Sequence, residues 1–184
     1  MCGICGVVFT DRTRTPQPEI LSRMADTLRF RGPDAEGFYI APGIGFGHRR
    51  LKVIDLEGGV QPMTDPSGQA TICYNGEVYN FLELRRELTS AGVDFRTSSD
   101  TEVLLLGYLQ WGSGILQRIA GMFAFALWDA REETLWLARD RLGVKPLYWA
   151  SLQDGSLVFA SELSAIAASG LTESRLDLEA AARY

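Results

Sequence analysis

Short apolar stretches with strand-like alternation recur along this 184-residue chain and constrain its fold more than any other feature. Helical spacing of apolar residues is confined to fewer segments, and most of these lie together in the middle of the chain. The expected strands cover residues 1–10, 36–40, the first part of 44–56, 70–74, 122–129, 134–138, 147–150 and 157–161. The expected helices cover residues 19–30, 79–91 and 103–111, with short turns at 115–119 and 165–168.

Grouped strands and grouped helices favour an α+β fold over an alternating βαβ sheet. The length suits one domain with a single well-formed core. A last helical pattern begins at Asp177 and runs to the final residue, Tyr184. No internal repeat or low-complexity linker divides the chain.

Composition excludes several classes of function. Hydrophobic residues make up 46% and charged residues 22%, as in ordinary globular proteins. The formal charge of −5 argues against general binding to nucleic acid or anionic membranes. We expect a cytoplasmic protein, because no apolar run is long enough to span a membrane and the N-terminus does not resemble a signal peptide. Three cysteines and one histidine suggest neither a disulfide framework nor a metal site.

Cys2 is the leading candidate nucleophile. If Met1 is removed, Cys2 carries a thiol and a free α-amine, whose ordinary pKa of about 7.7–8.0 makes it a suitable base near neutral pH. The alternative is that Cys2 is a small buried hydrophobic residue. The flanking Gly3 and Gly6 favour the catalytic interpretation, since glycine allows a substrate to approach the backbone closely.

Cys2 and Cys5 also form a Cys-x-x-Cys pair. In redox proteins such a pair begins a helix that follows a strand. Here nothing precedes the pair and a strand-like run follows, in which residues three apart point to opposite faces. A thiol redox site is therefore a weaker hypothesis, and zinc binding is weaker still.

Asn75 and Gly76 allow two interpretations. Asn-Gly is a strong signal for a hairpin turn, which is the simpler explanation. An amide side chain beside a glycine N–H at the end of a strand can also provide two donors for an oxyanion.

Arg49 and Arg50 should face opposite sides of a strand, so that one points outward. The other could bind a carboxylate through its guanidinium group. His48, the only histidine, is expected to be structural, although it is also the sole candidate for a Cys–His dyad.

Asp100 could cap the following helix or bind a ligand ammonium group. Ser99 could serve as the cap instead, because Glu102 follows it at the spacing of a capping box. The charged segment 138–148 is expected to be a polar turn with local salt bridges and no catalytic role.

Together these motifs resemble one family, the class II glutamine amidotransferase domain of asparagine synthetases. They follow the order of that family over nearly the whole chain. The matching segments are Met1-Cys2-Gly3-Ile4-x-Gly6, Arg31-Gly32-Pro33-Asp34, Gly47-His48-Arg49-Arg50-Leu51, Ile54-Asp55-Leu56, 74–80, 99–103, 121–126 and 139–148.

The resemblance implies a four-layer αββα N-terminal nucleophile hydrolase fold, with two stacked antiparallel sheets between helical layers. It also implies that Cys2 attacks the side-chain amide of L-glutamine, while Asn75 and the Gly76 N–H stabilise the oxyanion. Glutamate and ammonia are the implied products. The implied substrate-binding residues are Arg50 for the α-carboxylate, and Asp100, Glu77 and the backbone near Leu51 and Val53 for the α-amino end.

Asparagine synthetases continue into a synthetase domain with a Ser-Gly-Gly-x-Asp-Ser loop, which this chain lacks. We therefore expect an amidotransferase domain over residues 1–176 and the start of a linker or synthetase domain over 177–184. No metal or cofactor is expected in this chain. ATP and Mg²⁺ would belong to a synthetase domain acting in cis, and the resemblance also admits a homodimer.

Aspartate is the implied final acceptor of ammonia, with another acid as the alternative. Two rival functions remain open at this point: a non-catalytic domain of the same fold that binds glutamine or a partner, and a thiol redox protein.

Overall fold

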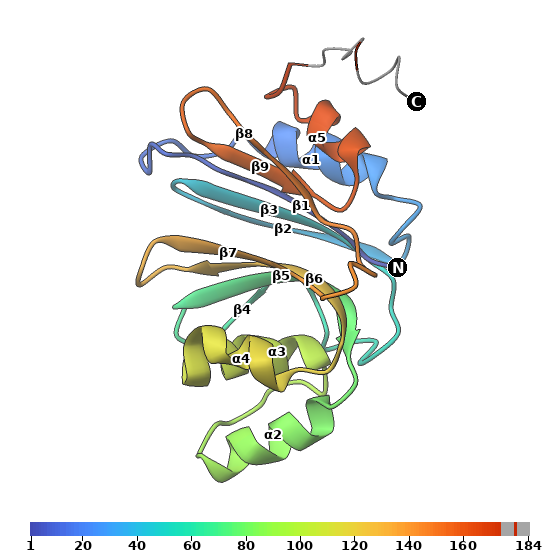
Figure 1. Cartoon of the computed structure of the whole chain (residues 1–184), viewed down its shortest axis with the longest axis vertical. Coiled ribbons are helices and arrows are strands. Elements are labelled where there is room, and N and C mark those ends of the chain that lie inside the picture. The colour runs from blue at the N-terminus through green and yellow to red at the C-terminus, as the bar shows by residue number, and fades with distance from the viewer. Residues whose placement is uncertain (174–178, 180–184) are drawn as a thin grey trace.

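Two antiparallel sheets stack between layers of helices in the computed structural model, which describes residues 1–173 and 179 (Figure 1). The strands are β1 (Gly3–Val8), β2 (Ala35–Ala41), β3 (Ile44–Arg50), β4 (Met63–Thr64), β5 (Ala70–Val78), β6 (Gly121–Asp129), β7 (Thr134–Arg139), β8 (Tyr148–Ser151) and β9 (Leu157–Ala160). The helices are α1 (Pro18–Thr27), α2 (Phe81–Ser90), α3 (Asp100–Trp111), the 3₁₀ turn Gly112–Gly114, α4 (Ile115–Arg118) and α5 (Leu163–Ala168).

The layer order is helices, sheet, sheet, helices. One sheet has the strand order β2-β3-β1-β9-β8 and the other has β4-β5-β6-β7. Helices α1 and α5 cover the outer face of the first sheet, α3 and α4 cover the outer face of the second, and α2 packs on the far side of α3 (Figure 1). The expected α+β fold with four layers is confirmed. The predicted domain boundary at 176/177 and the helical pattern over 177–184 lie outside the described residues, apart from residue 179.

Strand β1 lies at the centre of the first sheet, and all six of its residues are buried. It pairs with β3 on one side and β9 on the other. Ile4 packs against Cys73 and Ala126 of the second sheet, whereas Cys5 packs against Met24 of α1. This alternation is what a strand buried on both faces requires. It fixes the direction in which the preceding residue, Cys2, enters the structure.

Helix α3 is apolar on nearly every side because it is enclosed by β5 and α2. Ser99, one of the two candidate caps, is its N-cap, and its Oγ accepts the N–H of Glu102 at 3.2 Å. The reciprocal half of the capping box is absent among the described contacts. The Glu102 carboxylate instead accepts the N–H groups of Arg96 and Thr97, at 2.9 and 2.7 Å.

The hairpin interpretation of Asn75-Gly76 is wrong. Strand β5 does not end at residue 74 but continues to Val78, with Asn75 opposite Ala124 and Gly76 opposite Phe123 in β6. The long pairing with β6 overrides the local turn preference, as tertiary context commonly does for strands. Other boundaries shift as well; for example, β3 ends at Arg50 and α2 begins at Phe81.

Two glycines of β1 are needed for packing. A Cβ on Gly3 would lie 2.8 Å from the Cβ of Leu28, and one on Gly6 would lie 2.5 Å from the Phe159 ring. These contacts are too close for any side chain. The interpretation that these glycines admit a substrate is therefore replaced by close packing of the sheet against its neighbours.

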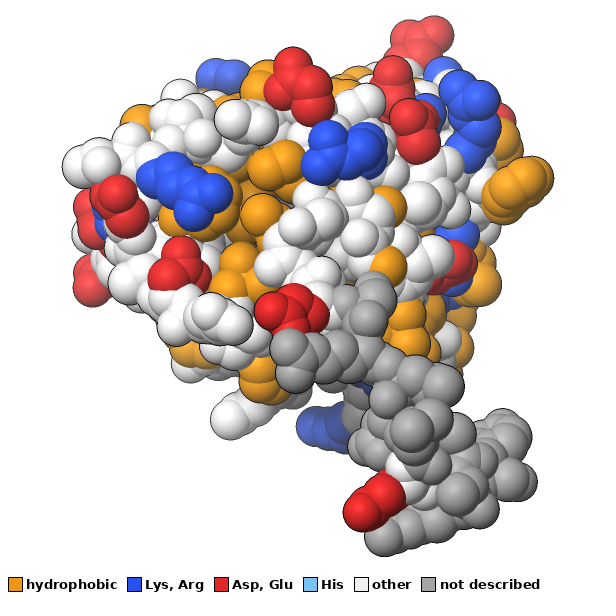
Figure 2. All heavy atoms as spheres, turned by 90° about the horizontal axis from the view of Figure 1, so that it is seen from above, with side chains coloured by type: hydrophobic (Ala, Val, Ile, Leu, Met, Phe, Trp, Pro, Cys, Tyr) orange, Lys and Arg blue, Asp and Glu red, His pale blue; other side chains and the backbone are white. Residues whose placement is uncertain are grey.

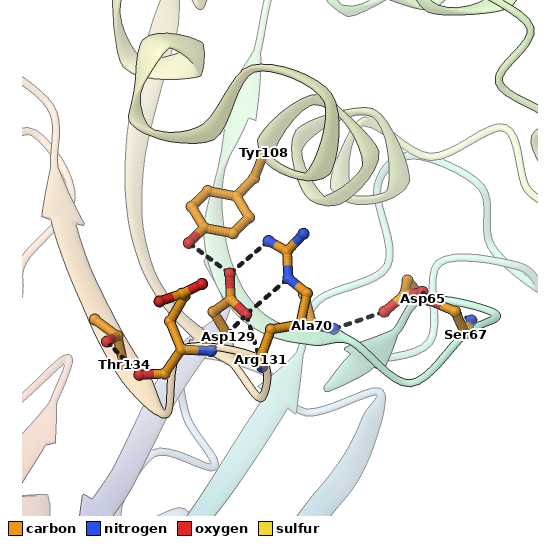
Figure 3. Close-up of polar contacts among 8 residues, drawn as sticks. Asp65, Ser67, Ala70, Tyr108, Asp129, Arg131 and Thr134 are labelled. Atoms are coloured by element: carbon orange, nitrogen blue, oxygen red, sulfur yellow. Dashed lines mark hydrogen bonds and ion pairs between the residues drawn. The ribbon is translucent and has the colours of Figure 1, made fainter.

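The hairpin between β6 and β7, predicted across residues 130–133, is closed by a buried carboxylate (Figure 3). Asp129 is 1% exposed and accepts the Tyr108 hydroxyl at 3.0 Å. It also accepts the backbone N–H of Arg131 at 2.9 Å and a guanidinium N–H of the same residue at 2.6 Å. Mainly because of Arg131, the pKa of Asp129 falls to about 2, while burial raises the pKa of Tyr108 to about 12.

The surface above α1 and α5 carries acidic and basic side chains interspersed with apolar ones (Figure 2). A mixed surface of this kind produces no large field of one sign. Among the described helices, none has the length and hydropathy needed to cross a bilayer.

Candidate active site

A cavity of about 210 Å³ opens where the head of β1 meets the ends of β3 and β5 and the start of α3. The N-terminus lies at this end of the stacked sheets (Figure 1). All eight site residues expected from the sequence line this cavity: Cys2, Arg50, Leu51, Val53, Asn75, Gly76, Glu77 and Asp100. A small cavity with several convergent polar groups is typical of a binding site for a small molecule.

Cys2 is partly buried, and its sulfur lies against the backbone of Leu51. The Leu51 N–H donates to Sγ at 3.4 Å, and the thiol lies 3.6 Å from the Leu51 carbonyl. Burial raises the pKa of the Cys2 thiol, although the contact with Leu51 and the charge of Arg50 partly oppose that rise. The thiol is therefore protonated at neutral pH and needs a base before it can act as a nucleophile.

The Arg31-Gly32-Pro33-Asp34 motif holds the head of β1 against the end of β3. Arg31 Nε donates to the Cys2 carbonyl at 3.0 Å, and Arg31 also pairs with Glu162 at 3.2 Å. The Asp34 N–H donates to the Arg50 carbonyl at 3.0 Å. A Cβ on Gly32 would lie 2.3 Å from the Arg49 carbonyl, so the backbones can approach only at glycine. This motif therefore supports the position of Cys2.

Asn75 lines the cavity and carries an unpaired donor. The residue is 1% exposed, and its Nδ2 has no hydrogen-bond partner among the described residues. Buried donors in native proteins rarely stay unpaired, and exceptions call for a functional explanation. Gly76 follows directly and lines the same cavity. The arrangement can accommodate a negatively charged oxygen.

Both arginines of β3 are buried, so the expectation that one points outward is wrong. Arg49 is 7% exposed and its guanidinium pairs with Asp26 of α1, a contact that also includes Glu36 at 2.8 Å. Arg50 is 5% exposed and lines the cavity. The cause is the layered fold, because α1 covers the outer face of the sheet to which Arg49 points.

Arg50 also fixes the loop of residues 51–60 that borders the cavity. Its Nη atoms donate to the carbonyls of Ile54, Asp55 and Leu56, at 3.3, 2.5 and 3.2 Å. Its Nε–H donates to none of the described residues. The Asp55 carboxylate accepts the N–H of Ser98 at 2.7 Å and so ties the loop to the segment before α3.

Asp100 occupies the opposite part of the lining, at the first position of α3. Its Oδ2 accepts the Tyr74 hydroxyl at 2.9 Å and the Val78 N–H at 3.1 Å. Burial raises the pKa of Asp100, with these two donors opposing the rise. A buried carboxylate of this kind is stabilised by a cationic ligand. Glu77, which is less buried, adds a second carboxylate to the lining.

His48 is structural, as expected. It is fully buried between the sheets, and its Nε2 donates to the Tyr74 carbonyl at 3.0 Å. Burial lowers the pKa of His48 to about 4, so the ring is neutral at pH 7. The described contacts of the Cys2 sulfur are with Leu51, and none supports a Cys–His dyad. Cys5 packs on the other side of the sheet, so the structure gives no support to a redox pair with Cys2.

Several residues of the cavity lining were not predicted as site residues, and Gln61 and Lys145 are two of them. Gln61 is buried, and its side chain accepts the Tyr74 N–H at 2.6 Å and donates to Thr101 at 3.3 Å. Lys145 belongs to the segment expected to be only a polar turn, yet it lines the cavity. The signal was present in the sequence, because Lys145 is one of only two lysines beside 16 arginines.

The segment 138–148 is indeed a turn, but its expected salt bridges are not among the described ion pairs. Hydrogen bonds between side chains and the backbone hold it instead: the Asp140 carboxylate accepts backbone N–H groups, and the Arg139 guanidinium donates to backbone carbonyls. Nor do the described residues contain a group of three or more His, Cys, Asp or Glu side chains arranged for a metal ion.

Solved structures of other proteins have a similar fold. Glutamine phosphoribosylpyrophosphate amidotransferase from Bacillus subtilis superimposes with a TM-score of 0.74 at 24% sequence identity. The match covers 94% of this chain and 44% of that one. The expected N-terminal nucleophile hydrolase fold is therefore confirmed.

Curated relatives are similar in sequence over most of the chain. Glutamine-hydrolyzing asparagine synthetase 3 of Bacillus subtilis is 44% identical over 179 residues, covering 96% of this chain and 29% of that protein. Glutamine-hydrolyzing asparagine synthetase B of Escherichia coli is 37% identical over 169 residues, covering 90% of this chain and 30% of that protein. The chain thus spans less than a third of the length of either relative.

The family profile of the glutamine amidotransferase domain matches residues 1–184, the full length of the sequence. Fold, sequence relatives and profile agree, and every motif of the resemblance except Arg31-Gly32-Pro33-Asp34 contributes a residue to one cavity. The chain belongs to the glutamine amidotransferase domain family.

Proposed function

We propose that this domain hydrolyses L-glutamine to glutamate and ammonia through a thioester on Cys2. The observation that carries the proposal is the meeting, in one cavity, of a partly buried thiol and the unpaired amide donor of Asn75. A nucleophile beside an unused donor is the arrangement needed to attack a carbonyl and stabilise its oxyanion.

The mechanism starts from a chain that has lost Met1. The α-amine of Cys2 takes the thiol proton, and the sulfur forms a bond to the side-chain carbonyl carbon of glutamine. The Asn75 Nδ2–H and the Gly76 N–H stabilise the oxyanion. The protonated amine then gives its proton to the departing nitrogen, and ammonia leaves. Water, deprotonated by the same amine, attacks the thioester, releases glutamate and regenerates the thiol.

The two ends of the amino acid would bind at different walls of the cavity. The guanidinium of Arg50 suits the α-carboxylate, because planar N–H groups match carboxylate oxygens. Asp100 and Glu77 suit the α-ammonium group, together with backbone carbonyls near Leu51 and Val53. This polarity would place the side-chain amide near Cys2.

The ammonia would pass to an ATP-dependent synthetase domain in the same polypeptide, where ATP and Mg²⁺ would bind. This part of the proposal rests on the longer relatives, which are named glutamine-hydrolyzing asparagine synthetases. Aspartate is the acceptor that those names favour. A different acid acceptor would use the same ammonia-producing half. In this scheme residues 1–176 form the amidotransferase domain, and 177–184 lead toward the synthetase.

A non-catalytic glutamine-binding domain is the competing proposal. The Met1 side chain lines the cavity, and a Met1 that stays attached would convert the Cys2 amine into an amide. That amide cannot accept the thiol proton. The same cavity could then bind glutamine without hydrolysing it.

The intact mass of the purified native protein, before and after a glutamine-analogue chloroketone, tests both proposals together with glutamate release. We expect a chain without Met1, one adduct on Cys2, and glutamate production. Cys2→Ala should lose both adduct and activity, whereas Cys5→Ser, the matched cysteine control, should keep them.

Glutamate production by Cys2→Ala, or retention of Met1, would contradict the catalytic proposal. Glutamine binding seen by calorimetry without turnover would favour the non-catalytic domain. Loss of activity in Cys5→Ser, with the fold intact, would point to a redox pair instead.

A further inference from the structure

Lys145 places a buried ammonium group in the cavity wall without a charged partner. The residue is 6% exposed, and the recorded contact of its Nζ is the Met1 sulfur, at 3.3 Å. None of the ion pairs among the described residues includes Lys145. Removing a charge from water without pairing it costs free energy. A group held at such a cost inside a cavity is a candidate for function.

The backbone around Lys145 is held firmly in place. The Asp140 carboxylate accepts the N–H groups of Val144 and Lys145, at 2.9 and 3.0 Å. Arg139 Nε donates to the Lys145 carbonyl at 2.8 Å. Gly143 allows the tight turn by adopting a φ of +65°. The turn therefore keeps the lysine side chain directed toward the chain head.

The ammonium group also lies close to the reacting end of the chain. Five covalent bonds separate the Met1 sulfur from the Cys2 nitrogen, a reach of about 6 Å at most. Adding the 3.3 Å contact places Lys145 Nζ within about 10 Å of that nitrogen. Removal of Met1 would take away the thioether and leave the ammonium group near the new α-amine.

We propose that Lys145 is a positioning residue that keeps the α-amine of Cys2 uncharged, and so ready to accept a proton, at neutral pH. The inference rests on the proposed function, in which that amine is the base. A nearby cation disfavours protonation of an amine and favours ionisation of a thiol. Both effects prepare the pair for attack.

Other charged groups near the chain head are more fully compensated. Arg31, which contacts the Cys2 carbonyl, is paired with Glu162, and Arg50 donates to carbonyls of the loop 51–60. The carboxylates of the lining act in the opposite direction, because they favour a charged amine. The ionisable groups that face the cavity are Cys2, Arg50, Tyr74, Glu77, Asp100 and Lys145.

The test compares pH profiles of the processed protein, whose loss of Met1 is first verified by intact mass. Lys145→Met removes the charge at similar length, Lys145→Gln is a second neutral variant, and Lys145→Arg keeps the cation. Lys52→Met is the matched control, because Lys52 is the other lysine and is exposed. Two rates are measured: kcat/KM for glutamate release, and alkylation of Cys2 by iodoacetamide.

In both neutral variants we expect the acidic limb of each profile to move up by roughly 0.5 to 1.5 pH units, as Coulomb's law gives at this range of distances. Well below the midpoint the rates should fall about 3- to 30-fold, while the plateau at high pH changes little. Lys145→Arg and Lys52→Met should keep the wild-type midpoint.

An unmoved acidic limb in the neutral variants would overturn the inference, as would an equal loss of rate at every pH. If the neutral variants show the shift in alkylation but the wild-type protein releases no glutamate, the proposed function is contradicted and the inference stands. Retention of Met1 in the native protein would overturn both.

Discussion

Asn75 is the single residue that most strongly supports a catalytic role for the cavity. Its amide nitrogen is buried and unpaired, although the strand around it is fully paired with β6. A fold selected for stability alone has no use for such a donor, because an unsatisfied buried polar group costs about 1–3 kcal/mol. The donor is explained if its partner is an oxygen that appears only during reaction.

Asn75→Ala should therefore lower kcat for glutamine hydrolysis by roughly 10²- to 10³-fold, as loss of one oxyanion donor does in other enzymes. KM should change little, because the donor acts in the transition state. Steady-state assays of glutamate release check this expectation.

Asn80→Ala is the matched control, because Asn80 lies outside the cavity and its side chain bonds to Arg118 and Ala120. It should keep the wild-type kcat. A variant of Asn75 that changed only KM would show that the amide binds the ground state.

At this scale the sequence picked out eight residues that the fold brings to one cavity, and it described their surroundings less well. The eight expected residues belong to motifs, and a motif can be recognised in the sequence without knowledge of how the chain packs. Arg49 and Lys145 were misjudged because their burial depends on distant parts of the chain. Strand alternation shows that Arg49 and Arg50 face opposite ways, but it cannot show that a helix covers the second face.

Strand β1 illustrates how an element positions the site. It lies between β3 and β9 and packs against the second sheet. Its glycines are required because a Cβ would clash with neighbouring atoms, not because the chain turns there. A methyl group on Gly6 would meet the Phe159 ring at 2.5 Å and the Gly45 carbonyl at 2.6 Å.

Gly6→Ala should destabilise the protein by about 1–3 kcal/mol or more through overpacking. Gly114→Ala provides the control, since its Cβ would lie 3.9 Å from the nearest side chain and its φ of −60° suits alanine. Urea unfolding followed by fluorescence measures both. Equal stability of the two variants would show that β1 can shift to absorb the methyl group.

Elements were predicted from the sequence where local pattern and tertiary setting agreed. Helix α3 combines a capping serine with an apolar run, and it forms as expected. Residues 75–78 are the counterexample, because Asn-Gly favours a turn while the partner strand β6 extends the pairing past it. The partner lies more than 40 residues away in the sequence, so local reasoning could not include it.

For the molecule as a whole, the buried Asp129 links folding to pH. The pKa of Asp129 is lowered to about 2 in the folded state, chiefly by Arg131, and is about 3.9 when unfolded. A lowered folded pKa gives stability that is complete above the unfolded value and is lost as the pH falls from about 4 toward 2. The contribution is about 2 kcal/mol.

Asp129→Asn should therefore be less stable than wild type at pH 6, and the difference should shrink by about 2 kcal/mol as the pH approaches 2. Urea unfolding at a series of pH values tests this. Asp94→Asn, at an exposed position, should match wild type throughout. A difference for Asp129→Asn that did not vary with pH would assign its effect to packing.

The position of Met1 has a practical consequence for handling the protein. Because its side chain lines the cavity and contacts Lys145, anything fused ahead of Met1 would start at the edge of this cavity. An affinity tag or reporter at the N-terminus would keep the Cys2 nitrogen in an amide bond, so that under the proposed function a well-folded preparation would be inactive. Affinity tags should therefore be placed at the C-terminus. Any N-terminal extension should be removable by a protease that cleaves immediately before Cys2.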